Sequence, residues 1–416
     1  MVKTLGLLLF ASIVVQSCPN HNSSSKDPRT TWIEKNAINV RSISPIDTDY
    51  EDLSPLKEII GDARVVLLGE QTHGGATTFE AKVRLAKFLH KEMGFAVMAF
   101  ESGMYDCAKI WQQMQLGKPM EEEVLKSMFY MYATSTEVKP LFQYMDAQLK
   151  TKAPLILTGM DSQHTGEKSQ NSLVNDLKAY LDKLDSESIE EEVWDVFKRK
   201  VSDIIAMKRE VTHEDKMIFY QGLEFLKNKL AKVESNGETF PDSSTFWLQI
   251  LKSIESQAKR YWGDIWDMDR DRQMADNMSW LLNFPFKDKK VIVWAHNFHI
   301  ARGLDPILPM GHYLKNEFQD KMYAIGFTGY DGVFFDFASN KESKIAKSDS
   351  LSLEQSIRNT NWKYAILDFT RQTENGSWLE QSQKGRLFNF YEQMVIYPNI
   401  YDGLFYIQTT TPTIRE

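Results

Sequence analysis

The sequence predicts an α/β fold: a central, largely parallel sheet with flanking helices and a mostly helical insert. Short apolar runs rich in Val, Ile and Leu alternate with longer stretches of helical periodicity, as in sheets buried on both faces. The span 166–284 has no such run and is charged, with amphipathic spacing. The predicted strands are Val65 to Gly69, Ala96 to Phe100, Leu155 to Gly159, Val291 to Ala295, Tyr323 to Phe327, Tyr364 to Phe369 and Leu404 to Gln408.

These elements divide the chain into five parts. We expect a signal peptide at 1–18, a tether at 19–45, an α/β core in two parts at 46–165 and 285–416, and a helical insert at 166–284. Within the insert one helical face is apolar and should be buried; it comprises Trp247, Ile250, Leu251, Ile254 and Ala258.

The composition describes a folded globular protein. Of 416 residues 42% are hydrophobic and 25% charged, with a formal charge of -8. Disordered chains have fewer apolar residues and a larger charge imbalance. The acidic balance also argues against binding to duplex nucleic acid, which requires a Lys/Arg surface.

The N-terminus predicts export and a lipid anchor. Lys3 precedes an apolar stretch, Leu5 to Val15, which is too short to span a membrane and resembles a secretory signal. It ends in Val15-Gln16-Ser17-Cys18, which resembles a bacterial lipobox, so Cys18 would be lipidated and hold the protein to a membrane at the periplasm or cell surface. The alternative is an ordinary cleaved signal with an incidental cysteine. With Cys18 lipidated, Cys107 has no disulfide partner.

Acids and imidazoles follow four of the predicted strands. Because ligands bind at the carboxyl ends of parallel strands, we expect these side chains to share one edge of the sheet. They are Glu70 and His73 after the first strand, Glu101 after the second, Asp161, Gln163 and His164 after the third, and His296, Asn297 and His299 after the fourth.

The loop that carries His73 leads into a predicted helix. Thr77 and Glu80 have the spacing of a capping box, which predicts that the helix starts there. Phe79, Val83 and Ala86 should then face the core. His73 would lie between a strand end and a helix N-terminus.

The sequence limits the chemistry of this site. It contains no Gly-x-Ser-x-Gly elbow, no phosphate-binding loop and no dinucleotide fingerprint. What remains is water activated by a base or by a metal. An imidazole tuned by a carboxylate can take a proton from water at neutral pH. Imidazoles and carboxylates also suit zinc, manganese or iron, although His-Glu-x-x-His is absent.

Arg270 lies at helical steps of four from Trp262, Trp266, Met274 and Met278, which places a guanidinium near an apolar stripe. A buried arginine requires a carboxylate or an anionic ligand. We expect Arg270 to pair with Glu70 or Glu101 or to face a developing oxyanion. The alternative is a surface arginine.

Several collinear motifs resemble the erythromycin esterase family from about residue 60 to the C-terminus. They are Gly69-Glu70-Gln71-Thr72-His73-Gly74, Lys82-Val83-Arg84-Leu85, Gly94-Phe95, Glu101, Gly159-Met160-Asp161-Ser162-Gln163, Arg270, Met274-Ala275-Asp276-Asn277, Trp294-Ala295-His296-Asn297-Phe298-His299 and Met310-Gly311. The chain departs from the family pattern at Gln71, where alanine is frequent, and at Thr78, where glutamate is frequent.

The resemblance implies hydrolysis of a macrocyclic lactone by water, without a covalent intermediate, a function connected with macrolide resistance. The motifs leave the metal requirement open; we expect that no cofactor is required, with a divalent metal as the alternative. It implies His73 as general base, within a polar site of Glu70, Glu101, His296, His299 and Arg270. We expect substrate contacts from Asp161, Gln163, His164, Lys82, Arg84 and Asn297.

Two alternatives stay open. One is a hydrolase of a non-macrolide substrate that depends on a divalent metal. The other is a surface lipoprotein that binds a metal or haem without turnover. The expected partners are a small-molecule ester and, through the anchor, a membrane.

Overall fold

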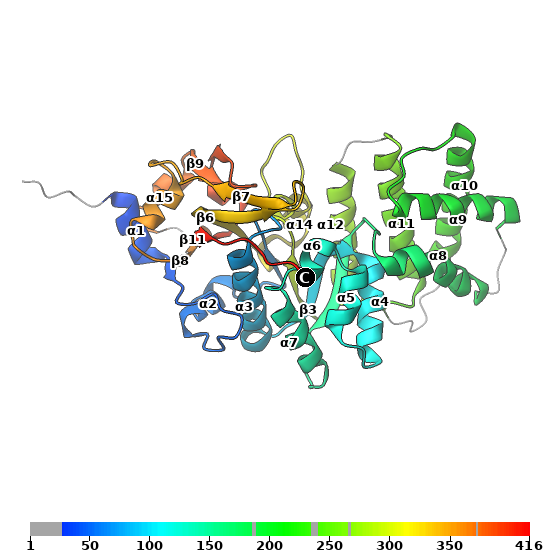
Figure 1. The fold of residues 1–416 in the computed structure, drawn as a ribbon, viewed down its shortest axis with the longest axis horizontal. Helices are drawn as coiled ribbons and strands as arrows, with labels where there is room; N and C mark the ends of the chain where they lie inside the picture. Colours follow the sequence, from blue (N-terminus) through cyan, green and yellow to red (C-terminus); the bar gives the residue numbers. More distant parts are fainter. Residues whose placement is uncertain (1–26, 185–188, 234–239, 265–267, 372) are drawn as a thin grey trace, which may run out of the picture.

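The structure is a computed structural model that describes residues 27–184, 189–233, 240–264, 268–371 and 373–416. Its centre is a nine-stranded sheet in the order β1-β8-β11-β6-β2-β5-β3-β4, with β7 paired to β6; β9 and β10 form a separate ribbon (Figure 1). The strands are β1 (Ile38–Asn39), β2 (Val65–Leu68), β3 (Phe95–Gly103), β4 (Ile156–Asp161), β5 (Lys290–Trp294), β6 (Met322–Asp336), β7 (Lys341–Ile345), β8 (Tyr364–Asp368), β9 (Gln383–Arg386), β10 (Glu392–Val395) and β11 (Gly403–Thr410).

Helices cover the sheet on both faces. In the first half of the chain they are α1 (Pro28–Asn36), α2 (Leu56–Ile60), α3 (Ala76–Met93), α4 (Met104–Gln115), α5 (Met120–Ser127), α6 (Tyr130–Ala133) and α7 (Lys139–Leu149). In the second half they are α8 (Glu167–Asp182), α9 (Glu191–Ile205), α10 (His213–Ala231), α11 (Ser244–Tyr261), α12 (Met268–Asn283), α13 (Asn297–Ile300), α14 (Met310–Phe318), α15 (Leu353–Arg358) and α16 (Tyr397–Ile400).

The predicted α/β class and all seven predicted strands are confirmed. They correspond to β2, β3, β4, β5, β6, β8 and β11. The neighbours from β11 through β6, β2, β5 and β3 to β4 are parallel, and β1, β7 and β8 pair antiparallel. The prediction lacks β1, β7, β9 and β10, because these strands are short or polar and leave no continuous apolar run.

The sheet separates two apolar cores. In β2 every residue is buried, and Val65 and Leu67 join one cluster while Val66 and Leu68 join the other. This alternation follows from the pleat, which turns successive side chains to opposite faces. A strand buried on both faces therefore has no polar position, which is why these strands are recognisable as apolar runs.

The described part of 166–284 consists of the helices α8 to α12 and no strand, as the sequence predicts. Helices α8 to α11 lie at one end of the molecule, opposite α1, and α12 lies between them and the sheet (Figure 1). The predicted apolar face is buried; its members are Trp247, Ile250, Leu251, Ile254 and Ala258. Of the stripe predicted to lead to Arg270, Met274 and Met278 are buried in α12, and Trp266 lies outside the described residues.

The segment predicted as a tether differs in the structure. Residues 19–26 and Cys18 lie outside the described residues. From Pro28 onwards, however, α1 packs Trp32 and Ile33 into the core, and β1 pairs with β8. The fold therefore starts inside the expected tether. Among the described residues no helix is long and apolar enough to cross a membrane, and Cys107 is buried as a free thiol.

The predicted capping box at the start of α3 is wrong. The helix starts at Ala76, and its N-cap residue Gly75 has no side chain to accept a hydrogen bond. The hydroxyl of Thr77 instead accepts from the backbone N–H of Thr411, 3.3 Å away. The prediction of the inward face is confirmed, since Phe79, Val83 and Ala86 are buried.

On another face of α3, Arg84 holds the segment that precedes β2. Its NH2 lies 2.7 Å from Asp52 Oδ1, and its NH1 donates to Asp52 Oδ2 at 3.0 Å and to the Ser42 carbonyl at 2.7 Å. Only 2% of the Arg84 side chain is exposed. An arginine so placed is a structural residue.

Replacement of Arg84 by methionine should lower the free energy of unfolding by about 3 kcal/mol, because it leaves Asp52 without its buried counter-charge. Urea unfolding measures this change. The control is Arg41→Met, which removes a cation that pairs with Asp47 but is 51% exposed, so its loss should lower the free energy of unfolding much less than the loss of Arg84. Equal losses in the two variants would contradict the structural role of Arg84.

Candidate active site

Four neighbouring parallel strands bring the predicted polar residues together. In the order β2, β5, β3, β4, they deliver Glu70, His296, Glu101 and Asp161 to one edge of the sheet. Because β3 continues to Gly103, Glu101 lies within the strand. The cluster thus comes from the alignment of strand ends, as expected for a parallel sheet.

His73 lies in the loop between β2 and α3. Its Nδ1 is 3.2 Å from Glu70 Oε1, and since a carboxylate only accepts, Nδ1 carries the hydrogen. The lone pair on Nε2 is then available. Burial lowers the pKa of His73 to about 4, so the ring is neutral at neutral pH. With 21% of the side chain exposed, the ring remains accessible.

The backbone of this loop is held by distant parts of the chain. The carbonyl of Gly74 accepts from the N–H of Phe335 at 2.9 Å and from that of Thr413 at 3.0 Å. A Cβ at Gly74 would overlap the carbonyl oxygen of Phe335, so this close approach requires glycine. The Ala76 N–H donates to the carbonyl of Thr411 at 2.8 Å.

Glu70 is fully buried and fixed by three donors. Its Oε1 accepts from the Tyr132 hydroxyl at 2.7 Å as well as from His73, and its Oε2 contacts Lys82 Nζ. Lys82 Nζ also lies 4.2 Å from the centre of the Trp294 ring. Burial lowers the pKa of Lys82. Three donors on one carboxyl group favour its ionised form, and with Lys82 protonated the Lys82–Glu70 pair is neutral overall.

A second group of charges surrounds Arg270, in the first turn of α12. Its Nε and NH2 bind Asp161 at 3.0 and 2.6 Å, and NH2 also binds Glu101 at 3.0 Å. Glu101 Oε2 accepts from the His296 backbone N–H at 2.8 Å. Burial raises the pKa of Glu101, but His299 and Arg270 outweigh it and hold this pKa well below its usual range. The predicted pairing of Arg270 with Glu101 is present.

His299 is held as a cation by two carboxylates. Its Nδ1 is 2.7 Å from Asp271 Oδ1, and its Nε2 is 3.2 Å from Glu101 Oε1. Burial lowers the pKa of His299, but Asp271 and Glu101 raise it to about 10. Asp271 is itself fixed by the backbone N–H of Met310 at 3.0 Å.

Both ring nitrogens of His296 are engaged with the backbone. Nε2 donates to the Gln71 carbonyl at 2.9 Å, and Nδ1 accepts from the Phe298 N–H at 3.1 Å. Burial lowers the pKa of His296 to about 3. This imidazole therefore braces the His73 loop against the end of β5.

Several residues that were predicted to contact the substrate make other contacts in the structure or are buried. Asn297 donates to the carbonyls of Phe327 and Leu387 and accepts from the Phe327 N–H, so its amide is used inside the core. Arg84 binds Asp52, as described above. His164 is fully buried, whereas Gln163 is partly exposed. The cluster includes Lys82 and Asp161, which contact other protein charges.

Sequence reasoning missed Tyr132 and Asp271. Tyr132 comes from the short helix α6, in an aromatic run with no strand before it. Asp271 directly follows Arg270, and the run Asp269-Arg270-Asp271 was the available signal. Within the described residues no three His, Cys, Asp or Glu side chains form a group that could hold a metal ion.

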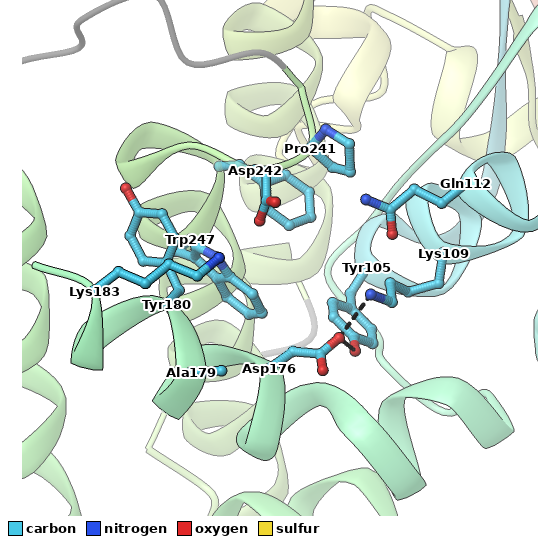
Figure 2. Close-up of a pocket in the computed structure, with 11 residues that line it drawn as sticks. Tyr105, Lys109, Gln112, Asp176, Ala179, Tyr180, Lys183, Pro241, Asp242 and Trp247 are labelled. Carbon is cyan, nitrogen blue, oxygen red and sulfur yellow. Dashed lines mark hydrogen bonds and ion pairs between the residues drawn. The ribbon is translucent and has the colours of Figure 1, made fainter. Parts of the chain in front are cut away.

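A separate cavity of about 190 Å³ lies among α4, α8 and α11 (Figure 2). Aromatic rings of Tyr105, Tyr180 and Trp247 line it, and Asp176 binds Lys109 and the Tyr105 hydroxyl, each at 2.7 Å. No residue of the His73 cluster lines this cavity.

The fold and the cluster define an α/β protein with an acid–base site at the carboxyl edge of its sheet. A family model described as Erythromycin esterase matches residues 90–410. The chain belongs to the erythromycin esterase family, which confirms the resemblance in its motifs.

Two relatives match over most of their lengths. The chain is 27% identical over 413 residues to "Putative hydrolase YbfO" of Bacillus subtilis (strain 168), covering 92% of this chain and 91% of the relative. It is 27% identical over 326 residues to "Erythromycin esterase type II" of Escherichia coli, covering 72% and 77%. The family and these names support a hydrolase of the esterase type.

Solved structures share the fold. A succinoglycan biosynthesis protein matches with a TM-score of 0.75 at 23% identity, over 92% of this chain and 97% of that chain. A Bacillus cereus protein matches at 0.76 and 21%, over 93% and 98%. A variant of erythromycin esterase EreC in its open conformation matches at 0.66 and 17%, over 88% and 96%.

Replacement of Asp271 by asparagine should lower the pKa of His299 by about two pH units, because it removes the stronger of two counter-charges. Titration of the histidine ring signals by NMR measures the pKa of His299. A raised pKa stabilises the fold below the unfolded value of about 6.5, and this contribution is lost as the pH rises through 10. The difference in the free energy of unfolding between the native protein and Asp271→Asn should therefore become smaller between pH 6 and pH 10.

The matched control is Asp276→Asn, on the same helix, which removes an exposed carboxylate that pairs with Arg272. It should leave the His299 titration unchanged. An identical His299 titration in the native chain and in Asp271→Asn would refute the assignment.

Proposed function

We propose that the protein hydrolyses a carboxylic ester or lactone, with His73 as general base. The observation that supports this most directly is the state of His73: neutral, accessible, with Nδ1 bound to Glu70 and the Nε2 lone pair left to take a proton. In the proposed reaction Nε2 removes a proton from water, and the hydroxide oxygen attacks the ester carbonyl carbon.

Arg270 is the proposed donor to the oxyanion. Its NH1 lies 3.2 Å from His299 Nε2, and once His299 is protonated that nitrogen is a donor and cannot accept from NH1. The N–H bonds of NH1 are then available to a substrate oxygen. We assign this role to Arg270 rather than to the two neighbouring imidazoles, because the ring nitrogens of His296 bind the backbone and the hydrogens of His299 face carboxylates.

The charge of the cluster supports a base at His73. Apart from the neutral Lys82–Glu70 pair, three carboxylates, Glu101, Asp161 and Asp271, face two cations, Arg270 and His299. The single negative charge left over compensates the imidazolium that forms on His73, and Glu101 is the group that raises the pKa of His73. When the tetrahedral intermediate collapses, the imidazolium returns its proton to the leaving alcohol oxygen.

His73→Gln should lower kcat about 100- to 10,000-fold, because the variant lacks the base, and leave the fold intact. The experiment incubates the chain with macrolides and simple esters and follows gain of one water by mass spectrometry. His312→Gln, which removes a histidine whose ring contacts Asn316 on α14, is the control and should keep native activity.

Full activity of His73→Gln would eliminate His73 as the base. If the native chain hydrolyses no ester of the panel, the proposal fails. Activity lost with chelator and restored by added metal would identify the metal-dependent alternative, and stoichiometric metal or a Soret band without turnover would identify the binding protein.

We also propose, from the motif that ends at Cys18, that the protein is exported and lipid-anchored. Expressed with its N-terminus in a bacterial host, it should fractionate with membranes and show the intact mass of a chain that starts at a diacylated Cys18. Cys18→Ser should release it to the soluble fraction. An unmodified Cys18 in the native chain would contradict the anchor.

A further inference from the structure

Tyr132 occupies the centre of the site without belonging to any motif. It lies on α6, between α5 and α7, and is fully buried. Its ring packs edge-on or tilted against the rings of Phe79, Phe100, Phe129, Trp294 and His73. These contacts fix the position of the hydroxyl.

The hydroxyl lies among three groups of the proposed mechanism. It is 2.7 Å from Glu70 Oε1, 3.4 Å from His73 Nδ1 and 3.4 Å from Glu101 Oε2. Both carboxylates can only accept, and one hydroxyl hydrogen can serve only one of them well, so it goes to Glu70. Burial and the neighbouring Glu101 raise the pKa of Tyr132, which keeps this hydrogen in place.

Glu70 Oε1 therefore accepts from two donors, Tyr132 and His73. A donor that binds the charged carboxylate stabilises it and makes it less basic. A less basic Glu70 attracts the Nδ1 hydrogen less strongly and leaves Nε2 a weaker base. The hydroxyl also lies between Glu70 and Glu101, the carboxylate that compensates the imidazolium.

We propose that Tyr132 is a positioning residue that, through Glu70, sets the orientation and basicity of His73. The proposal rests on the proposed role of His73. Tyr132 contacts no reacting atom. Its hydrogen bond to Glu70 determines which carboxylate oxygen faces His73 Nδ1 and how much negative charge that oxygen carries.

The test is Tyr132→Phe in the full chain, which removes the hydroxyl and keeps the ring contacts. Without that donor, the titration of His73 by histidine NMR should shift upward by about one pH unit. The acid limb of the pH profile of kcat/KM should shift upward with this pKa. Because the imidazole also loses its fixed orientation, kcat should fall about 10- to 100-fold with little change in KM.

Tyr144→Phe is the matched control. It removes the hydroxyl of a second tyrosine–histidine contact, partly buried between α7 and α3, where Tyr144 meets His90 Nδ1. It should leave the His73 titration and kcat as in the native protein. Circular dichroism melting of both variants checks that they fold.

Replacing the tyrosines by 3-fluorotyrosine gives a second measurement, in which the Tyr132 hydroxyl and ring are both kept. Fluorine makes the phenol a stronger donor, so the His73 titration should shift downward. An unchanged titration in Tyr132→Phe and in the fluorinated protein would overturn the proposal. Because the NMR measurements need no substrate, they decide the role of Tyr132 even if the native chain hydrolyses no ester.

Discussion

The ion pairs of Arg270 with Asp161 and Glu101 determine how this molecule is assembled. A buried guanidinium without a carboxylate would be strongly destabilising, so α12 must lie where β3 and β4 end. That contact joins the helical region to the sheet. It also orients Glu101, whose second oxygen accepts from the backbone of His296, and so links the loops after three strands.

The site consists of two halves that differ in charge. Around His73 the charges cancel within the Lys82–Glu70 pair, and burial keeps the imidazole neutral. Around Arg270 the carboxylates hold a permanent guanidinium and a protonated His299. In the proposed reaction the first half takes a proton from water and the second stabilises negative charge on the substrate oxygen.

Much of the fold could be predicted because buried parallel strands are apolar on both faces, and this leaves runs such as Val65–Leu68 in the sequence. The site followed from the strand ends, where Glu70, Glu101, Asp161 and His296 must meet. Tyr132 could not be predicted, since only the packing of α6 over the sheet brings it to Glu70. Arg84 and Asn297 lie inside the same motifs as Lys82 and His299, and a motif does not tell a structural polar residue from a site residue.

The backbone hydrogen bonds that hold the loop around Gly74 determine when, during synthesis, this loop can take its final geometry. The loop that carries His73 appears early in synthesis, but its backbone partners include Thr411 and Thr413, more than 300 residues later. A ribosome-bound chain therefore contains every side chain of the candidate site before it contains all of the backbone that holds the His73 loop. This order postpones the final backbone geometry of the His73 loop until synthesis has passed Thr413.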